Sequence, residues 1–388
     1  MHACLTGLLK VSLIAASLVV AASNAQAQIR IGMVVSATGP AASLGIPEKN
    51  TATLFPPVIA GQKVEYVVLD DASDATAATK AMRKLVTEDR VDAVIGSTLS
   101  PNSIAMTTVA AESGTPLVSI AGASSIVEPM DKQKAWVFKT PQHDSLMAAA
   151  ITQHMKAAGQ KTLGVIAQGD AYGDGWLREI TKAATPLGIR IVATERYART
   201  DSTVMGQALK VLATQPDAVL VAGAGTPAVL PEKTLRERGY KGAIYQTHGI
   251  ANNDVLRVGG KDMEGTVLPV GPVLVARQLP DGYPSKAAAI AYTDRYETAY
   301  GKGSVSTFGA HAWDAMLLLE AAIPSALKKA KPGTPEFRTA LRDSLEGVQN
   351  LTVTHGVMNL SPSNHNGLDD RARVMVVIKD EHWKLLGD

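Results

Sequence analysis

The chain has 388 residues, a formal net charge of +2 and a single cysteine, Cys4. The charge is nearly balanced and no basic cluster occurs, which argues against nucleic acid as a partner. With 46% hydrophobic residues the chain can bury a large core, and its length favours two domains. Because the only cysteine lies at the extreme N-terminus, core packing rather than disulfide bonds is expected to stabilise the folded part.

Residues 1–27 have the pattern of a cleavable secretory signal peptide. Lys10 precedes the apolar run Val11–Ala22, and Ala25-Gln26-Ala27 forms a small-residue cleavage site. The run is shorter than the roughly 20 apolar residues that span a bilayer. We therefore predict export to the periplasm, with the folded protein beginning at Gln28, and no later segment has the length and apolarity of a membrane span.

Short apolar runs alternate with helix patterns over most of the remaining chain. The predicted strands are Ile29–Val35, Val64–Leu69, Val91–Ile95, Leu117–Ile120, Thr162–Ala167, Arg190–Ala193, Ala218–Ala222 and Ala243–Gln246. The predicted helices are Asp74–Glu88, Asp144–Ala158, Gly175–Leu187, Val204–Ala213, Lys286–Tyr300 and Thr307–Leu327. Continuous apolar runs are typical of strands buried on both faces of a parallel sheet. The alternation predicts an α/β fold of doubly wound layers, arranged as two similar lobes.

Small and polar residues follow two neighbouring predicted strands within Val91–Ser125. Gly96–Ser103 follows the first strand and opens a helix, and Ala121–Ser125 follows the second. Parallel strands that end side by side present backbone N–H groups, hydroxyls and a helix N-terminus to one point. This segment predicts a cradle for a small anionic solute, and it contains no catalytic group.

The segment Gly223–Ala228 formally matches the dinucleotide-binding pattern G-x-G-x-x-A. That pattern also needs an acidic residue about 20 positions further on, and Ala243–His248 contains no carboxylate. Pro227 additionally removes one N–H donor from the helix start. A tight turn that lines a cleft is therefore the favoured interpretation.

Two aromatic side chains follow strands in the second half of the chain. Tyr172 lies in a glycine-rich turn in which Asp174 can cap a helix starting near Trp176, and it either contacts a ligand or closes the turn. His248 follows the strand Ala243–Gln246, and it either donates a hydrogen bond to a solute or caps the next helix. The sequence leaves both pairs of alternatives open.

No catalytic or metal-binding pattern emerges from the sequence. His311 and Asp314 are spaced to share a helix face, but a metal site needs a third ligand, so a paired core histidine is favoured. Asp70–Asp74 lacks the glycine and terminal glutamate of a calcium loop. We predict no enzyme, no metal and no cofactor, with an exported hydrolase assembled from distant residues as the alternative.

The end of the chain departs from the strand–helix alternation. Val353–Asn359 and Arg373–Ile378 are strand-like and are joined by the turn-rich segment Ser361–Gly367. This pattern predicts a hairpin-like addition.

Several short segments together resemble one family. They are Ile31–Pro40, Asp70-Asp71, Val94–Ser97, Ser119–Ser124, Phe138–Thr140 and Tyr172–Gly175. In this order and spacing, the chain resembles the type I periplasmic solute-binding proteins of ABC importers. The similar group is the leucine/isoleucine/valine-binding (branched-chain amino acid) group, with its aromatic-acid-binding branch. The resemblance implies two Rossmann-like lobes that are joined by a three-strand hinge and close on a ligand.

The resemblance also implies how the lobes divide the chain. Lobe one would comprise residues 28–140 plus 270–356, and lobe two residues 141–269 plus 357–388. The crossings would lie near Thr140-Pro141, Val267–Val270 and Gly356–Asn359.

The ligand-binding residues carried over from the family come from both lobes. They are Ser36, Leu44, Ser100, Ala121, Gly122, Ala123, Ser124, Tyr172, Thr226 and His248. Ser100 and the turn Ala121–Ser124 match the segments that bind the ligand carboxylate, although the turn is one residue longer here. Leu44 and Thr226 fall where amino-acid binders often have aromatic residues. His248 falls where they have a glutamate that pairs with the ligand ammonium.

The histidine at position 248 changes the expected ligand. A buried ammonium without a carboxylate partner loses a charge-assisted bond and keeps its desolvation cost, several kcal/mol by rough estimate. We predict a carboxylate without an α-ammonium, namely an aromatic acid of the benzoate or cinnamate type or a short aliphatic acid. The predicted protein is a monomeric receptor that delivers this ligand to an inner-membrane ABC permease, with a ligand sensor of the same fold as the alternative.

Overall fold

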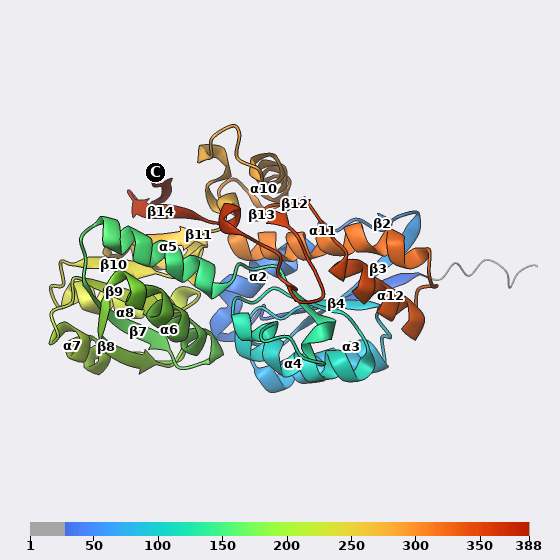
Figure 1. The fold of residues 1–388 in the computed structure, drawn as a ribbon, viewed down its shortest axis with the longest axis horizontal. Coiled ribbons are helices and arrows are strands. Elements are labelled where there is room, and N and C mark those ends of the chain that lie inside the picture. The colour runs from blue at the N-terminus through green and yellow to red at the C-terminus, as the bar shows by residue number, and fades with distance from the viewer. Residues whose placement is uncertain (1–27, 388) are drawn as a thin grey trace, which may run out of the picture.

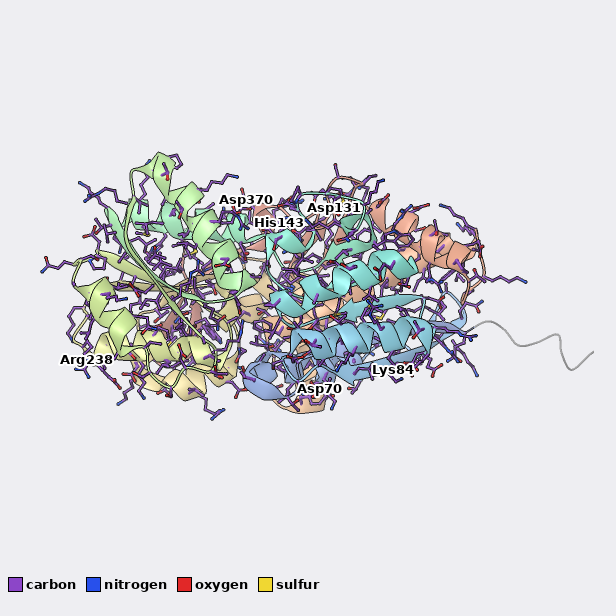
Figure 2. All side chains as sticks on the ribbon, turned by 90° about the horizontal axis from the view of Figure 1, so that it is seen from below. Asp70, Lys84, Asp131, His143, Arg238 and Asp370 are labelled. Carbon is purple, nitrogen blue, oxygen red and sulfur yellow. The ribbon has the colours of Figure 1, made fainter. Side chains whose placement is uncertain are left out.

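The computed structural model describes residues 28–387, which fold into two lobes that lie side by side (Figure 1). The predicted signal peptide, residues 1–27, lies outside the described residues. Exposed side chains such as Lys84 and Arg238 project from opposite lobes (Figure 2). None of the described helices combines the length and apolarity needed to cross a membrane.

Lobe one is built on a six-stranded sheet in the order β2-β3-β1-β4-β5-β6. Its strands are β1 (Ile29–Val35), β2 (Val58–Ile59), β3 (Gln62–Asp70), β4 (Ala93–Gly96), β5 (Leu117–Ser119) and β6 (Val137–Lys139). Its helices are α2 (Ala42–Ala52), α3 (Ala75–Thr87), α4 (Ser100–Ser113), α10 (Lys286–Tyr300), α11 (Thr307–Leu327) and α12 (Pro335–Glu346). All pairings except β2–β3 are parallel. Helices α3 and α4 cover one face of the sheet, and α11 and α12 cover the other.

Lobe two is built on a seven-stranded sheet in the order β15-β14-β11-β10-β9-β7-β8. Its strands are β7 (Thr162–Gln168), β8 (Arg190–Tyr197), β9 (Ala218–Ala222), β10 (Ala243–Gln246), β11 (Val267–Val270), β14 (Val374–Lys379) and β15 (His382–Leu385). Its helices are α5 (Asp144–Ala157), α6 (Ala171–Ala184), α7 (Met205–Leu212), α8 (Val229–Glu237) and α9 (Asn253–Gly259). Helices α5 and α6 pack on one face, and α7, α8 and α9 pack on the other. Both lobes therefore have the predicted doubly wound α/β architecture.

The predicted hairpin near the C-terminus is wrong. Residues of Val353–Asn359 form β13 (Gly356–Met358), which pairs with β12 (Leu351–Val353). Strand β14 instead pairs with β15 and, antiparallel, with β11 of lobe two. The segment between β13 and β14 packs on lobe one, so it cannot serve as a hairpin turn.

Contacts of this intervening segment locate the third crossing between the lobes. The N–H of Lys139 in β6 donates to the His365 carbonyl over 2.9 Å, and the Asn366 side chain donates to the Lys139 carbonyl over 3.0 Å. The chain therefore stays with lobe one beyond the predicted crossing at Gly356–Asn359. The other two passages lie between β6 and α5 and immediately after β11.

Two element boundaries differ from the prediction in ways that affect the site. Helix α6 begins at Ala171, because Asp170 rather than Asp174 is its N-cap and accepts the N–H groups of Tyr172 and Gly173. Strand β8 continues to Tyr197, beyond the predicted end at Ala193, because an edge strand tolerates half-exposed polar residues.

Helix α11 carries much of the lobe-one core, and Leu319 on it is fully buried. We expect Leu319→Ala to lower the free energy of unfolding by about 2–5 kcal/mol, because the truncation leaves a cavity. Urea unfolding measures this loss. The matched control is Leu209→Ala on α7, where the leucine is 51% exposed, and its free energy of unfolding should stay close to that of the wild type. Equal losses in the two variants would contradict this account of the core.

Candidate ligand-binding site between the lobes

A small cavity of about 30 Å³ lies between the lobes, where the carboxyl ends of both sheets face each other. Its described lining residues are Leu44, Thr98, Leu99, Ser100, Ile120, Gly122, Phe308 and His311 from lobe one, Tyr172, Arg199, Ala224, His248 and Gly249 from lobe two, and Pro141 from the hinge. Wider grooves of about 660 and 830 Å³ run along β15 and β14 on the outside of the molecule. Because they lie away from the strand ends, we take the inter-lobe cavity as the candidate site.

Half of the predicted ligand-binding residues line this cavity. They are Leu44, Ser100, Gly122, Tyr172 and His248. The lobes meet closely at Gly122, where a Cβ atom would lie 2.9 Å from Tyr172 Cε2 and 3.3 Å from His248 Nε2. Only a residue without a side chain allows this approach.

The other predicted residues are not among the described residues that line the cavity. They are Ser36, Ala121, Ala123, Ser124 and Thr226. The Ser36 hydroxyl donates to Asp71 over 2.7 Å, and the Ala123 N–H donates to Ser100 Oγ over 3.1 Å. The Thr226 N–H points across the lobes to Ser43 Oγ at 3.4 Å. Direct ligand contact by these five residues stays a prediction.

Ser100 is the first residue of α4, which starts at the cavity. Its hydroxyl oxygen accepts the Ala123 N–H, which leaves its own hydrogen available to the cavity. Leu99, the N-cap residue, provides no side-chain cap, and Pro101 has no N–H, so Ser100 and Asn102 carry the uncapped N–H groups of the first turn. These N–H groups and the helix dipole favour an anion at this end.

Lys139 lies behind the Gly122 turn and is fully buried. Its ammonium donates to the carbonyls of Gly122 (3.0 Å), Pro141 (2.7 Å) and Gln142 (3.0 Å). Burial lowers the pKa of Lys139, and the nearby Asp144 carboxylate partly offsets this effect. Lys139 therefore fixes the turn and places positive charge directly behind the site.

Arg199 is a site residue that the sequence analysis missed. Its side chain lines the cavity, and it is 12% exposed. Its Nε atom donates to Asp170 over 3.2 Å and one Nη atom donates to the Ala224 carbonyl over 3.0 Å. The observed extension of β8 explains the omission, since Arg199 follows the true strand end by two residues. Among the described lining residues, it is the only one with a permanent charge.

Two buried histidines face the cavity from opposite lobes. In each of His248 and His311, Nδ1 has no hydrogen-bond partner among the described residues. Burial, reinforced by the charge of Lys139, lowers the pKa of His248 to about 3. Burial, with His355 nearby, lowers the pKa of His311 well below its usual range. Both imidazoles are therefore neutral at physiological pH.

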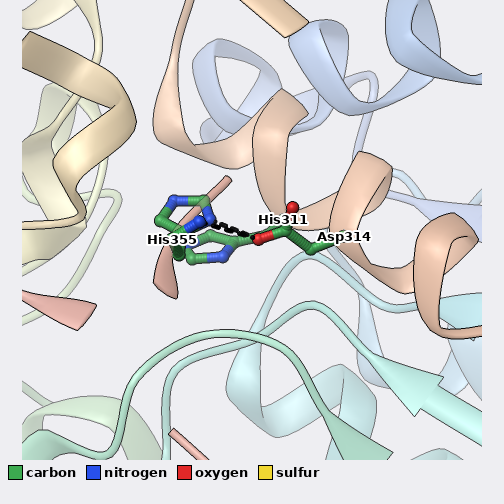
Figure 3. Close-up of side chains that lie close together, drawn as sticks. All are labelled: His311, Asp314 and His355. Atoms are coloured by element: carbon green, nitrogen blue, oxygen red, sulfur yellow. Dashed lines mark hydrogen bonds and ion pairs between the residues drawn. The ribbon is translucent and has the colours of Figure 1, made fainter. Parts of the chain in front are cut away.

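His311 belongs to a fully buried cluster with Asp314 and His355 (Figure 3). The two imidazole rings stack at 3.8 Å with an interplanar angle of 13°, and His355 Nδ1 lies 2.7 Å from Asp314 Oδ2. The potential ligating atoms lie within 4.8 Å of one another. Parallel stacked rings do not direct their in-plane lone pairs to a single point, so this geometry favours a hydrogen-bonded cluster over a metal centre. Sequence reasoning missed His355 because it lies far from α11 along the chain.

The sequence matches the family described as periplasmic binding protein over residues 28–381. The chain belongs to this family. A solved extracellular ligand-binding receptor from Rhodopseudomonas palustris HaA2 is 46% identical, covering 93% of this chain and 100% of that one, with a TM-score of 0.90. The Leu/Ile/Val-binding protein homolog 3 of Brucella melitensis is 25% identical over 63% of this chain and 68% of its own length.

A more distant solved structure is the solute-binding protein of an ABC transporter from R. palustris in complex with benzoate. It is 21% identical, covers 93% of this chain and 96% of that one, and has a TM-score of 0.78. This likeness shows the fold, which is that of the type I periplasmic binding proteins.

The neutral state of His248 predicts a dependence of stability on pH. The folded pKa of about 3 lies below the unfolded value of 6.5, so the unfolded chain binds the extra proton between these values. The free energy of unfolding should therefore fall as pH decreases below 6.5, by up to about 1.4 kcal/mol per pH unit from this residue. Urea unfolding at pH 7, 6 and 5 should show a shallower loss in His248→Gln than in the wild type.

His382→Gln is the matched control, because His382 is exposed on β15. This variant should keep the wild-type slope of stability against pH. Parallel slopes for wild type and His248→Gln would contradict this account, because they would show that His248 binds protons equally in the folded and unfolded states.

Proposed function

We propose that this protein is the periplasmic receptor of an ABC uptake system and that it binds a small carboxylate without an α-ammonium group. One observation carries the proposal. The described residues that line the inter-lobe cavity include the cation Arg199 and no acidic side chain. An anion is favoured in such a cavity, and an ammonium finds no counter-charge.

The proposed carboxylate lies between the lobes. From lobe one, the Ser100 hydroxyl and the first N–H groups of α4 would donate to it. From lobe two, Arg199 would add a charge-assisted bond, in addition to its present bond to Asp170. Because these groups come from different lobes, one carboxylate would hold the closed form together.

The neutral histidines argue against a zwitterionic amino acid. His248 stands where related amino-acid binders have a glutamate, and a neutral imidazole supplies no negative charge to an ammonium. Protonation would make the contact repulsive. Neutral imidazoles instead suit a hydroxyl or carbonyl group on the ligand, because each ring can donate or accept one hydrogen bond.

The remaining wall is apolar and partly aromatic. Leu44, Leu99, Ile120 and Phe308 face the cavity together with the ring of Tyr172. Such a wall suits an aromatic ring, which favours acids of the benzoate or cinnamate type, and short aliphatic acids form the second group. The benzoate complex of the R. palustris relative supports this ligand class. By the same family relation, the receptor would act as a monomer and deliver its ligand to an inner-membrane permease.

A ligand panel tests the proposed class. Benzoate, 4-hydroxybenzoate, cinnamate and 4-hydroxycinnamate should each be compared with butanoate and L-leucine by thermal shift and calorimetry. We expect at least one carboxylate without an ammonium to raise the melting temperature, since a ligand at 100 times its Kd stabilises by about 2.7 kcal/mol. L-Leucine should have no comparable effect. Tight leucine binding without any response to the other acids would overturn the proposal.

Substitution of Arg199 tests the carboxylate contact. Arg199→Met should weaken the binding of the acid identified above by about 2–5 kcal/mol, because the substitution removes a desolvated charged partner. Arg199→Lys should retain part of the affinity, since the charge remains. The matched control is Arg196→Met near the end of β8, where the arginine is half-exposed and pairs with Asp174 outside the cavity. Equal calorimetric affinities for wild type and Arg199→Met would remove Arg199 from the site.

A further inference from the structure

Asp314 attaches the turn between β12 and β13, which precedes the third hinge crossing, to helix α11. Its carboxylate is fully buried and accepts the N–H of Thr354 over 2.8 Å, the N–H of His355 over 3.3 Å and His355 Nδ1 over 2.7 Å. Thr354 and His355 form the turn between β12 and β13. A single side chain thus holds this turn against the helix.

The first two crossings reach the same point. In the first crossing, the Thr140 hydroxyl donates to the His311 carbonyl of α11 over 3.0 Å. In the second crossing, a Cβ atom on Gly271 would lie 2.0 Å from His355 Cδ2, so this segment passes directly against the imidazole. Gln142 also ties the first crossing to the last, because its amide donates to the Ala372 carbonyl over 2.7 Å.

His311 connects this hinge cluster to the ligand cavity. Its ring lines the cavity on one side and stacks on His355 on the other. Buried polar atoms remain without partners in the described part of the chain, namely His311 Nδ1, His355 Nε2 and Gln142 Oε1. Buried polar groups normally have partners, so such atoms are expected to gain hydrogen bonds in another state of the hinge or with a ligand.

We propose that His355 and Asp314 are positioning residues that couple the ligand to hinge closure. They set the orientation of His311 at the cavity and hold the β12–β13 turn, against which the second crossing packs, to one turn of α11. The ligand-facing part of this inference rests on the proposed function, whereas the hinge part does not. Loss of the pair should therefore alter lobe geometry even without a ligand.

The distance between the lobes is measured by double electron–electron resonance between two spin labels. Spin labels at Lys84→Cys and Arg238→Cys report on opposite lobes (Figure 2), in a Cys4→Ser background that removes the native cysteine. The hinge variants are Asp314→Asn, which keeps an acceptor for the Thr354 N–H, and His355→Phe, which keeps the stack on His311. The matched control is His154→Gln, which removes a histidine hydrogen bond of the same 2.7 Å length within lobe two.

We expect both hinge variants to broaden the inter-lobe distances of the ligand-free protein. The acid found in the panel should narrow the distribution of inter-lobe distances in the wild type. It should narrow the distributions of the variants to a smaller extent. Its affinity for them should fall about tenfold, which lies within the usual range for coupled sites. His154→Gln should behave as the wild type in both states.

Distance distributions of both hinge variants that equal those of the wild type would overturn the inference. Zinc binding to the wild type that is lost in Asp314→Asn would also overturn it, because the cluster would then be a metal centre. If no carboxylate of the panel binds the wild type, the proposed ligand class fails, and the ligand-free distances still decide the hinge role. Thermal unfolding of each variant shows whether it still folds. If one does not, Thr140→Val, which removes the hydroxyl that donates to the His311 carbonyl, is used in its place.

Discussion

The ammonium of Lys139, bound by three main-chain carbonyls, is the interaction on which the rest of the site depends. It holds the Gly122 turn, where the lobes meet, and the Pro141 and Gln142 carbonyls, where the chain first leaves lobe one. A buried ammonium is costly unless its hydrogens are satisfied, so this arrangement fixes the local backbone tightly. Asp144 supplies the nearby opposite charge, and burial raises the pKa of that carboxyl.

On the proposed function, the same charge would influence which solutes the cavity accepts. It disfavours protonation of His248 and His311, so that both rings enter the site as neutral hydrogen-bonding groups. Arg199 lines the same cavity, and the N-terminus of α4 starts at it. An amino acid would gain at its carboxylate and lose at its ammonium, whereas a simple acid gains without that loss. The discrimination thus comes from the whole electrostatic environment rather than from one residue.

Sequence reasoning recovered what depends on local patterns and missed what depends on distant contacts. The strand β1 and the helix α11 were predicted with their observed bounds, because buried parallel strands and long apolar helices have clear periodicities. Ser100 and Gly122, which line the cavity, belong to segments that the sequence analysis singled out next to strand ends, whereas Phe308 and His311 on α11 were not predicted to line it. Arg199 was missed because an edge strand with polar residues has a weak pattern. His355 was missed because nothing local links it to His311.

In a two-lobe receptor, ligand specificity depends on contacts that both lobes make with the ligand in the closed state. The cavity of about 30 Å³ is too small for any acid of the proposed class, so binding of such an acid requires the lobes to separate first. A ligand shifts the equilibrium towards closure only by its additional affinity for the closed form. Ser100 alone would bind a carboxylate equally well in an open or a closed molecule, since it belongs to one lobe. On the proposed function, contacts that exist only when both lobes are engaged, such as those of Arg199 and His248 opposite Ser100, would therefore determine whether a bound acid produces the form that a permease can recognise.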